Sequence, residues 1–204
     1  MNSSDSQAIP TWRQYWPVGA LLIVIVVLGG AGDSVADALA YQRQALGQAQ
    51  WWRILTGHIV HLNGVHTAMN VLAAGLLVMI FRDAVSPVEW LVAFFLVAVS
   101  VSLALYVLHP GLTRYVGASG VIHGLAAFSA IRALPTMRFE SCVLLIGMML
   151  KLGSESLRGA AASTEALIGG RVITEAHLYG AFSGVVIGLC WAIFLRRRAS
   201  RPAA

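Results

Sequence analysis

Residues 115–124 read Tyr-Val-Gly-Ala-Ser-Gly-Val-Ile-His-Gly, and they open an apolar run that extends to residue 133. A run of this length is close to the roughly 20 residues that a helix needs to cross a bilayer. Hydrocarbon penalises polar groups, so a serine framed by glycines with a histidine one turn later indicates function. Two further histidines, His66 and His177, each lie near the start of another apolar run. The pattern indicates chemistry carried out inside a membrane.

The composition is that of an integral membrane protein. The chain is 58% hydrophobic and only 11% charged, whereas soluble domains carry about 25% charged residues. Apolar runs recur and predict six transmembrane helices, at 16–32, 63–81, 88–108, 116–133, 139–152 and 175–195. Because these runs nearly exhaust the chain, we predict one all-α domain over residues 1–204. Its core, at about 14–196, lies between a short polar N-terminal tail and a basic C-terminal tail.

The positive charges indicate how the chain is oriented. The last apolar run is followed directly by four arginines: Arg196, Arg197, Arg198 and Arg201. Basic residues beside a span favour the cytoplasmic side. An even number of spans puts both termini on one side, so we predict that both are cytoplasmic. Once the arginines are assigned to topology, the net charge of +5 gives no support for nucleic-acid binding.

Ser119 lies where the fourth helix is expected to begin, near Val116 or Gly117. In the first turn of a helix the backbone N–H groups lack intrahelical partners and the dipole is positive. An anion site beside a hydroxyl is what acyl transfer requires, and Gly117 and Gly120 let the backbone approach a substrate carbonyl. Ser119 is therefore a candidate nucleophile. The structural alternative is a serine N-cap followed by a packing pair, Gly120 and Gly124.

A second glycine pattern accompanies His177 near the start of the sixth helix. Glycines follow it at spacings of three, seven and eleven, hence on roughly one stripe: Gly180, Gly184 and Gly188. Such stripes let two transmembrane helices approach closely. If this stripe faces Gly120 and Gly124, Ser119 and His177 meet at the same depth, and the imidazole can serve as the base without a third carboxylate. Glu175, about 200° around the helix from His177, is left out of the site.

Other polar residues of the apolar runs are candidates for supporting roles. His123, at i+4 from Ser119, is an alternative base, but we favour a residue that packs beneath or orients His177. His66 and Asn70 share a helix face and are candidate oxyanion donors; the alternative is hydrogen bonding between helices. No His-Glu-x-x-His pattern occurs, so we expect no metal and no cofactor.

The segments between the runs carry weaker signals. The loop at 31–62 either caps the bundle or braces the site laterally; it includes a predicted short helix at 36–49 and Trp51-Trp52-Arg53, which suit a membrane interface. Residues 153–174 are small and polar, and we predict a mobile loop, either a lid or a plain connector. We interpret His58 as incidental, His61 as structural and His109 as an exposed loop residue.

Taken together, these motifs resemble the rhomboid family of intramembrane serine proteases. The resemblance spans nearly the whole chain and consists of Trp52-Arg53, His66-x-x-x-Asn70, Gly117-x-Ser119-Gly120 and Ala176-His177-x-x-Gly180-x-x-x-Gly184, in the family's order. It implies a dyad of Ser119 and His177. It also implies that the oxyanion is stabilised by the backbone amides of Ser119 and Ala118, within the Gly117–Ser119 turn, together with His66 and Asn70.

One departure from the family pattern points to a subgroup. Many bacterial rhomboids have a tyrosine at the position of His123, and the histidine here, with Glu-Ala-His-Leu at 175–178, is similar to the rhombosortases. That resemblance implies an inner-membrane protease whose site opens to the periplasm, acting on secreted proteins with a C-terminal Gly-Gly, one hydrophobic helix and a basic tail. Membrane lipid is the other expected partner.

Three other functions remain open from the sequence. The chain could be a general rhomboid protease of single-span substrates, or its acyl-enzyme could be resolved by an amine instead of water. A non-enzymatic alternative is a rhomboid-like pseudoprotease that binds and retains membrane clients. Such proteins usually lack the serine or the histidine, whereas both Ser119 and His177 are present here.

Overall fold

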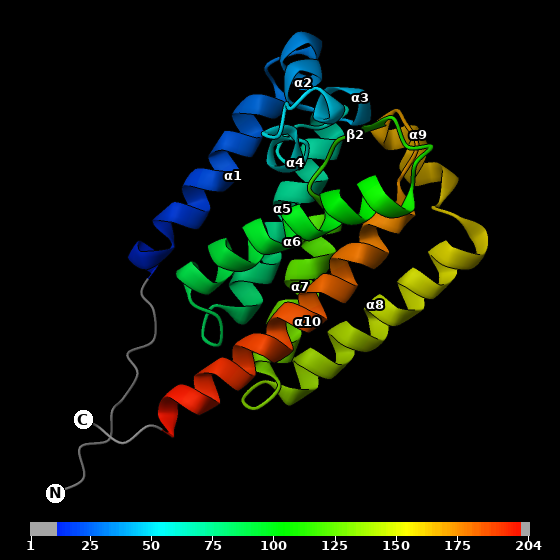
Figure 1. The fold of residues 1–204 in the computed structure, drawn as a ribbon. Coiled ribbons are helices and arrows are strands. Elements are labelled where there is room, and N and C mark those ends of the chain that lie inside the picture. The colour runs from blue at the N-terminus through cyan, green and yellow to red at the C-terminus, as the bar shows by residue number, and fades with distance from the viewer. Residues whose placement is uncertain (1–11, 201–204) are drawn as a thin grey trace, which may run out of the picture.

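The computed structural model describes residues 12–200. The N-terminal tail before residue 12 and Arg201 lie outside the described residues. Within them the chain is mostly helical, and a helix occupies each predicted run (Figure 1): α1 (Trp16–Gly29), α5 (Gly64–Phe81), α6 (Pro87–Leu108), α7 (Ser119–Ala133), α8 (Arg138–Arg158) and α10 (Thr174–Ala199). The prediction of a helical membrane bundle is therefore confirmed as a mostly helical fold for this part of the chain.

Short elements connect the long helices. They are η1 (Trp12–Tyr15), α2 (Asp33–Leu39), β1 (Tyr41–Gln42), α3 (Arg43–Gly47), α4 (Arg53–Thr56), β2 (Arg114–Tyr115) and α9 (Ala162–Ile168). The single short helix predicted at 36–49 is wrong, because β1 separates two short helices there. β1 pairs antiparallel with β2, Tyr41 opposite Tyr115. This pairing ties the first loop to the segment that leads into α7.

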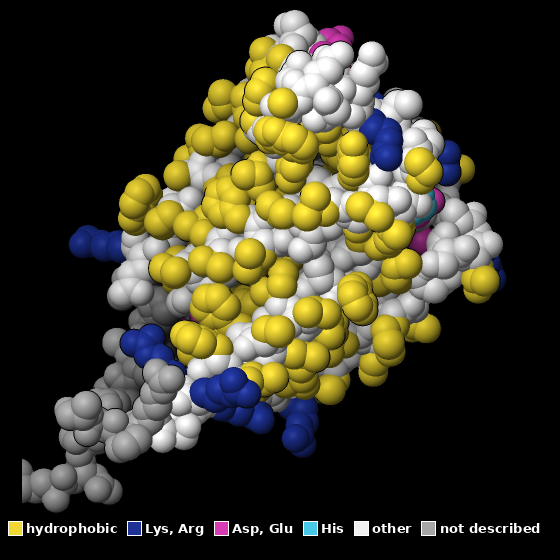
Figure 2. Space-filling view, in the orientation of Figure 1, with side chains coloured by type: hydrophobic (Ala, Val, Ile, Leu, Met, Phe, Trp, Pro, Cys, Tyr) yellow, Lys and Arg dark blue, Asp and Glu magenta, His cyan; other side chains and the backbone are white. Residues whose placement is uncertain are grey.

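Three of the described helices are long and apolar enough to cross a membrane: α5, α6 and the Thr174–Arg198 part of α10. The apolar helix at Arg13–Gly29 is shorter. Figure 2 shows hydrophobic side chains over most of the visible face, with lysines and arginines gathered towards its ends. These features are those of a multi-pass membrane protein, and the count of six spans remains a prediction.

Helix α7 is the central element of the bundle. It is buried along most of its length and packs more extensively against α10 than against any other element. It has 15 residues, so it is about 22 Å long, shorter than a hydrocarbon core of roughly 30 Å. At its far end Arg132 pairs with Glu89 at 2.9 Å, and Glu89 also forms a capping box with Ser86 at the start of α6. These contacts fix the position of α7 against α6.

The first loop covers the end of the bundle at which α7 and α10 begin (Figure 1). Arg53 is buried, and its Nη1 donates to the carbonyls of Asp37 at 2.8 Å and Ala40 at 2.7 Å. Its guanidinium therefore holds the loop together from inside and is not the exposed interface anchor that the sequence predicts. Trp51 and Trp52 are exposed, and their interface role remains a prediction.

The predicted loop at 153–174 is largely helical. Helix α8 continues to Arg158 and ends where Gly159 adopts a φ of 76°. After a short break the chain forms α9, and the Glu165 carboxylate then accepts a hydrogen bond from the Val172 N–H at 2.9 Å. The segment is thus more helical than predicted, and its first residues extend α8 beyond the apolar run. Its mobility and its role as lid or connector remain predictions.

Candidate active site

The turn before α7 requires glycine at residue 117. Gly117 has a φ of 114°, which L side chains rarely adopt, and a Cβ there would lie 2.6 Å from His66 Cε1. The turn is held from both sides: the Tyr115 hydroxyl donates to the Gly117 carbonyl at 2.8 Å, and the Gly117 N–H donates to the Gly57 carbonyl at 2.9 Å. Ser119 follows as the first residue of α7.

The glycine stripes of α7 and α10 face each other. A Cβ on Gly120 would lie 2.8 Å from the Ala176 carbonyl oxygen. A Cβ on Gly180 would overlap the carbonyl oxygen of Gly120, and one on Gly184 would overlap that of Gly124. The backbones therefore touch, which only glycine permits here, in line with the contact that the spacing predicts.

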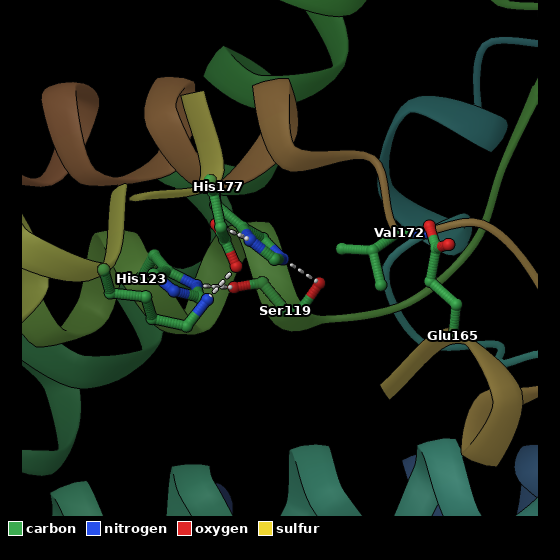
Figure 3. A network of polar contacts seen from close by, with 7 residues as sticks. Ser119, His123, Glu165, Val172 and His177 are labelled. Carbon is green, nitrogen blue, oxygen red and sulfur yellow. Dashed lines mark hydrogen bonds and ion pairs between the residues drawn. The ribbon is translucent and has the colours of Figure 1, made fainter. Parts of the chain in front are cut away.

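This close approach brings Ser119 and His177 together (Figure 3). Their Oγ and Nε2 atoms are 3.0 Å apart, a hydrogen-bond distance. His177 is buried, with 4% of its surface exposed. A hydroxyl bonded to one imidazole nitrogen is the geometry of a nucleophile and its general base.

The other ring nitrogen of His177 faces a carboxylate. His177 Nδ1 lies 2.8 Å from Oε2 of Glu155, in the last turns of α8. The other oxygen of Glu155 pairs with Lys151, one turn earlier. The sequence interpretation missed Glu155 because it ended the fifth helix near residue 152. Glu175, which it left out, forms no hydrogen bond with His177 among the described residues.

His123 stacks on His177, with ring centroids 4.2 Å apart and ring planes 15° apart (Figure 3). Its Nδ1 lies 2.7 Å from the Ser119 carbonyl oxygen. A carbonyl only accepts, so Nδ1 carries the proton and donates. Since this nitrogen is bonded to the backbone of its own helix, His123 is placed to support the His177 ring. The Ser119 hydroxyl bonds to His177, so His177 is the better placed base.

His66 and Asn70 line the same cavity as Ser119. The Leu62 N–H donates to His66 Nδ1 at 3.4 Å, so a neutral His66 carries its proton on Nε2. Asn70 Nδ2 donates one hydrogen to the His66 carbonyl at 2.9 Å, which leaves its second N–H. Each side chain therefore keeps one neutral donor beyond its structural bond.

The backbone amides before Ser119 are already bonded. The Gly117 N–H donates to Gly57, and the Ala118 N–H donates to His61 Nε2 at 3.3 Å. In this structure neither amide is therefore a free donor at the site. The resemblance implied such a role for the Ala118 amide. The Ser119 N–H is at the first helical position, where no intrahelical acceptor exists.

A cavity of about 640 Å³ holds these groups, within the range of roughly 300–1,000 Å³ typical of ligand sites. The cavity is lined by the four polar residues of the site, Ser119, His66, Asn70 and His177. Three cationic side chains also line it: Arg114, Lys151 and Arg171. All three cations are exposed. Among residues 12–200, no group of three or more His, Cys, Asp or Glu is arranged to hold a metal ion.

Two histidines away from the cavity, His58 and His109, form hydrogen bonds between elements. His58, interpreted as incidental, is fully buried, and its Nε2 lies 3.0 Å from the Ala98 carbonyl and 2.9 Å from Ser102 Oγ. It ties the first loop to α6. His109, interpreted as exposed, is half-buried at the end of α6 and bonds to the Tyr179 hydroxyl of α10.

Burial makes the two loop histidines sensitive to acid. Burial lowers the pKa of His61 from 6.5 to about 3, with His66 lowering it further, and burial lowers the pKa of His58 to about 4. Both are neutral in the folded protein, while the unfolded chain takes up their protons below about pH 6.5. The unfolded state therefore binds more protons in that window, and the free energy of unfolding falls as the pH falls.

We predict that acid destabilises the protein from about pH 6.5 downward, by up to about 1.4 kcal/mol per pH unit for each of these histidines. His61→Gln keeps an acceptor for the Ala118 N–H but does not titrate, so its unfolding temperature in detergent micelles should depend less on pH. His109→Gln is the control, because His109 is half-buried. Equal pH dependence in wild type and His61→Gln would contradict this prediction.

Comparison with known proteins agrees with the geometry. No curated protein matches the chain significantly. A family model described as the Rhomboid domain matches residues 48–194, well over half of the chain. The matched range contains Ser119, His177, His66 and Asn70. The family is one of intramembrane serine proteases, and this chain belongs to the rhomboid family.

Proposed function

We propose that this chain is an active intramembrane serine endopeptidase of the rhombosortase type, with Ser119 as nucleophile and His177 as base. The observation that supports it most is the 3.0 Å contact between Ser119 Oγ and His177 Nε2 beside a cavity between helices. A client-binding pseudoprotease has no use for a hydroxyl bonded to a buried imidazole. The contact therefore favours catalysis.

In the proposed reaction Ser119 Oγ attacks a peptide carbonyl while His177 Nε2 takes its proton. The tetrahedral oxyanion is stabilised by neutral donors: the Ser119 N–H, the Nε2–H of His66 and the second amide hydrogen of Asn70. His177 then gives the proton to the leaving amine, and the C–N bond breaks. His177 then deprotonates a water that attacks the acyl-enzyme, the bond between the acyl carbon and Ser119 Oγ breaks, and His177 returns the proton to Oγ.

The substrate class follows from the resemblance to rhombosortases and from helix energetics. A helical backbone hides its carbonyls, so a transmembrane tail must unwind before Ser119 attacks. Two glycines lower that cost by about 2 kcal/mol relative to alanine, or roughly 30-fold in the unwound population. A Gly-Gly pair ahead of a hydrophobic helix is therefore the proposed cleavage region.

The proposed location is the inner membrane, with both termini cytoplasmic and the site open to the periplasm. The start of α1 and the end of α10 lie at the same end of the bundle (Figure 1). The arginines that close α10 are at that end, and basic residues beside a span favour the cytoplasm. Ser119 is the first residue of α7, and His177 lies in the first turn of α10. Both are at the opposite end of the bundle from these arginines.

The proposal is tested by co-expression with an exported reporter that ends in Gly-Gly, an apolar helix and a basic tail. Wild-type protein should cleave it, and a reporter with Ala-Ala in place of Gly-Gly should be cleaved about 30-fold more slowly. Mass spectrometry of the new C-terminus separates hydrolysis from transfer to an amine. Equal cleavage of both reporters would contradict the rhombosortase assignment in favour of a general rhomboid protease.

A further inference from the structure

Rhomboid-type chemistry needs a serine and a histidine, but this chain adds a carboxylate on the far side of the imidazole. Glu155 Oε2 lies 2.8 Å from His177 Nδ1, and Ser119 Oγ lies 3.0 Å from His177 Nε2. Both partners of this contact are shielded, with 5% of the His177 side chain and 12% of the Glu155 side chain exposed. The three groups form an unbroken line from hydroxyl to carboxylate.

The position of Glu155 is electrostatically costly unless it has partners. It lies near the C-terminal end of α8, where the helix dipole disfavours an anion. His177 lies in the first turns of α10, where the dipole disfavours a cation. A carboxylate against an imidazole that becomes positively charged offsets both penalties. Lys151 pairs with the other oxygen of Glu155 and so also offsets the penalty for an anion at the end of α8.

The stacking of His123 on His177 does not by itself fix the state of the His177 ring. A stacked imidazole can flip by half a turn about its Cβ–Cγ bond, and it can carry its proton on either nitrogen. A carboxylate accepts a hydrogen bond and does not donate one, so Glu155 holds the proton on Nδ1. Nε2 is then left with its lone pair towards Ser119, which is the state that a general base needs.

We propose that Glu155 is a positioning residue that, with Ser119 and His177, completes a serine–histidine–glutamate triad. The inference rests on the proposed protease function. Glu155 orients the imidazole and stabilises the imidazolium that forms when Ser119 Oγ loses its proton. It does not itself take up a proton, and it makes no bond to the substrate.

Several charged or titratable groups share this environment and shape the pH dependence of the reaction. His66 faces His177 from α5, His123 from α7, and Lys151 and Glu155 from α8. Arg114 and Arg171 line the same cavity. Glu155 is the group among them that bonds directly to the His177 ring through its Nδ1 atom. Removing its charge therefore acts on the protonated ring most directly.

The test uses the full chain in detergent micelles and a fluorophosphonate as the probe of Ser119, so no substrate need be known. Glu155→Gln should lower the maximal labelling rate by roughly 10²-fold or more while the half-saturating probe concentration stays within about threefold. The acid limb of its rate–pH profile should move to lower pH, because the imidazolium loses its anionic partner. Glu155→Asp, which restores the charge, should recover part of the rate.

Two further variants of α8 guard against a merely structural effect. Glu140→Gln changes an exposed carboxylate in the first turn of α8 and should label like wild type. Lys151→Met alters an exposed side chain and leaves the full charge of Glu155 on His177, so its acid limb should move to higher pH. Because it keeps Glu155, it remains informative even if Glu155→Gln does not fold.

The outcomes separate this inference from the proposed function. If wild type labels at Ser119 but Glu155→Gln and Lys151→Met label at the same rate with the same pH profile, the triad is overturned and the dyad stands. A loss of rate in Glu155→Gln with no shift of the acid limb in either variant also overturns it. If wild type itself neither labels nor cleaves a reporter, the proposed function fails.

Discussion

Replacing Ser119 by alanine is expected to reduce cleavage of a single-span reporter by about 10⁴-fold or more, because loss of the nucleophile removes the covalent route. The fold should be unaffected, since the hydroxyl points from the start of α7 towards His177 and the cavity. Cleavage is followed by the ratio of full-length to shortened reporter in membranes, at matched expression of the two proteins.

Ser129→Ala is the matched control for this variant. Ser129 lies on the same helix, is fully buried, and its hydroxyl has no hydrogen-bond partner among residues 12–200. Removing it deletes the same atom without touching the proposed chemistry, so cleavage should continue at the wild-type rate. Cleavage that persists in Ser119→Ala would reject Ser119 as the nucleophile.

The second large effect is expected from a single methyl group on α10. Gly180→Ala places a Cβ on the carbonyl oxygen of Gly120, so α7 and α10 must separate locally. Overpacking of a close-packed core typically costs about 1–3 kcal/mol, and a clash with backbone should lie at or above the upper end. Because His177 lies on the same helix, three residues before Gly180, its Nε2 should also move away from Ser119, and a shift of about 1 Å costs roughly 10²-fold in rate.

Gly147→Ala provides the comparison for Gly180→Ala. Gly147 lies within α8, and a Cβ there would meet nothing within 4 Å. Alanine favours a helix by up to about 1 kcal/mol over glycine, so this variant should unfold at the same or a higher temperature. Unfolding temperatures and reporter cleavage of the two variants measure the effect. Wild-type behaviour of Gly180→Ala would contradict the backbone contact between α7 and α10.

The parts of the site that depend on spacing could be predicted from the sequence. Glycines at i, i+4 and i+8 create a flat helix face, and an in-phase histidine or serine must then lie at the contact. Gly120, Gly124, Gly180 and Gly184 show this in the structure. His66 and Asn70, one turn apart on α5, likewise both line the cavity.

Glu155 could not be found in this way because hydropathy ends the fifth apolar run at Leu152. Signals for a longer helix were present: Lys151 and Glu155 are an i,i+4 pair, and glycine follows Arg158 at residue 159. Even a correct helix end would not have placed Glu155 against His177, since that contact depends on how α8 packs against α7 and α10.

The bonded amides of Gly117 and Ala118 illustrate a different limit. Their acceptors, Gly57 and His61, come from the first loop, roughly 60 residues earlier in the chain. No periodicity links a loop to a distant helix start. The pairing of β1 with β2 brings the two segments together, and a two-residue strand leaves no recognisable signal in the sequence.

The account is tested most directly by locating the adduct formed when the purified protein reacts with a fluorophosphonate. Digestion and tandem mass spectrometry should place the adduct on Ser119, and the adduct should be lost in His177→Ala, because the hydroxyl is activated by Nε2 of His177. An adduct on another serine, or labelling of Ser119 that is unchanged without His177, would contradict the catalytic pair.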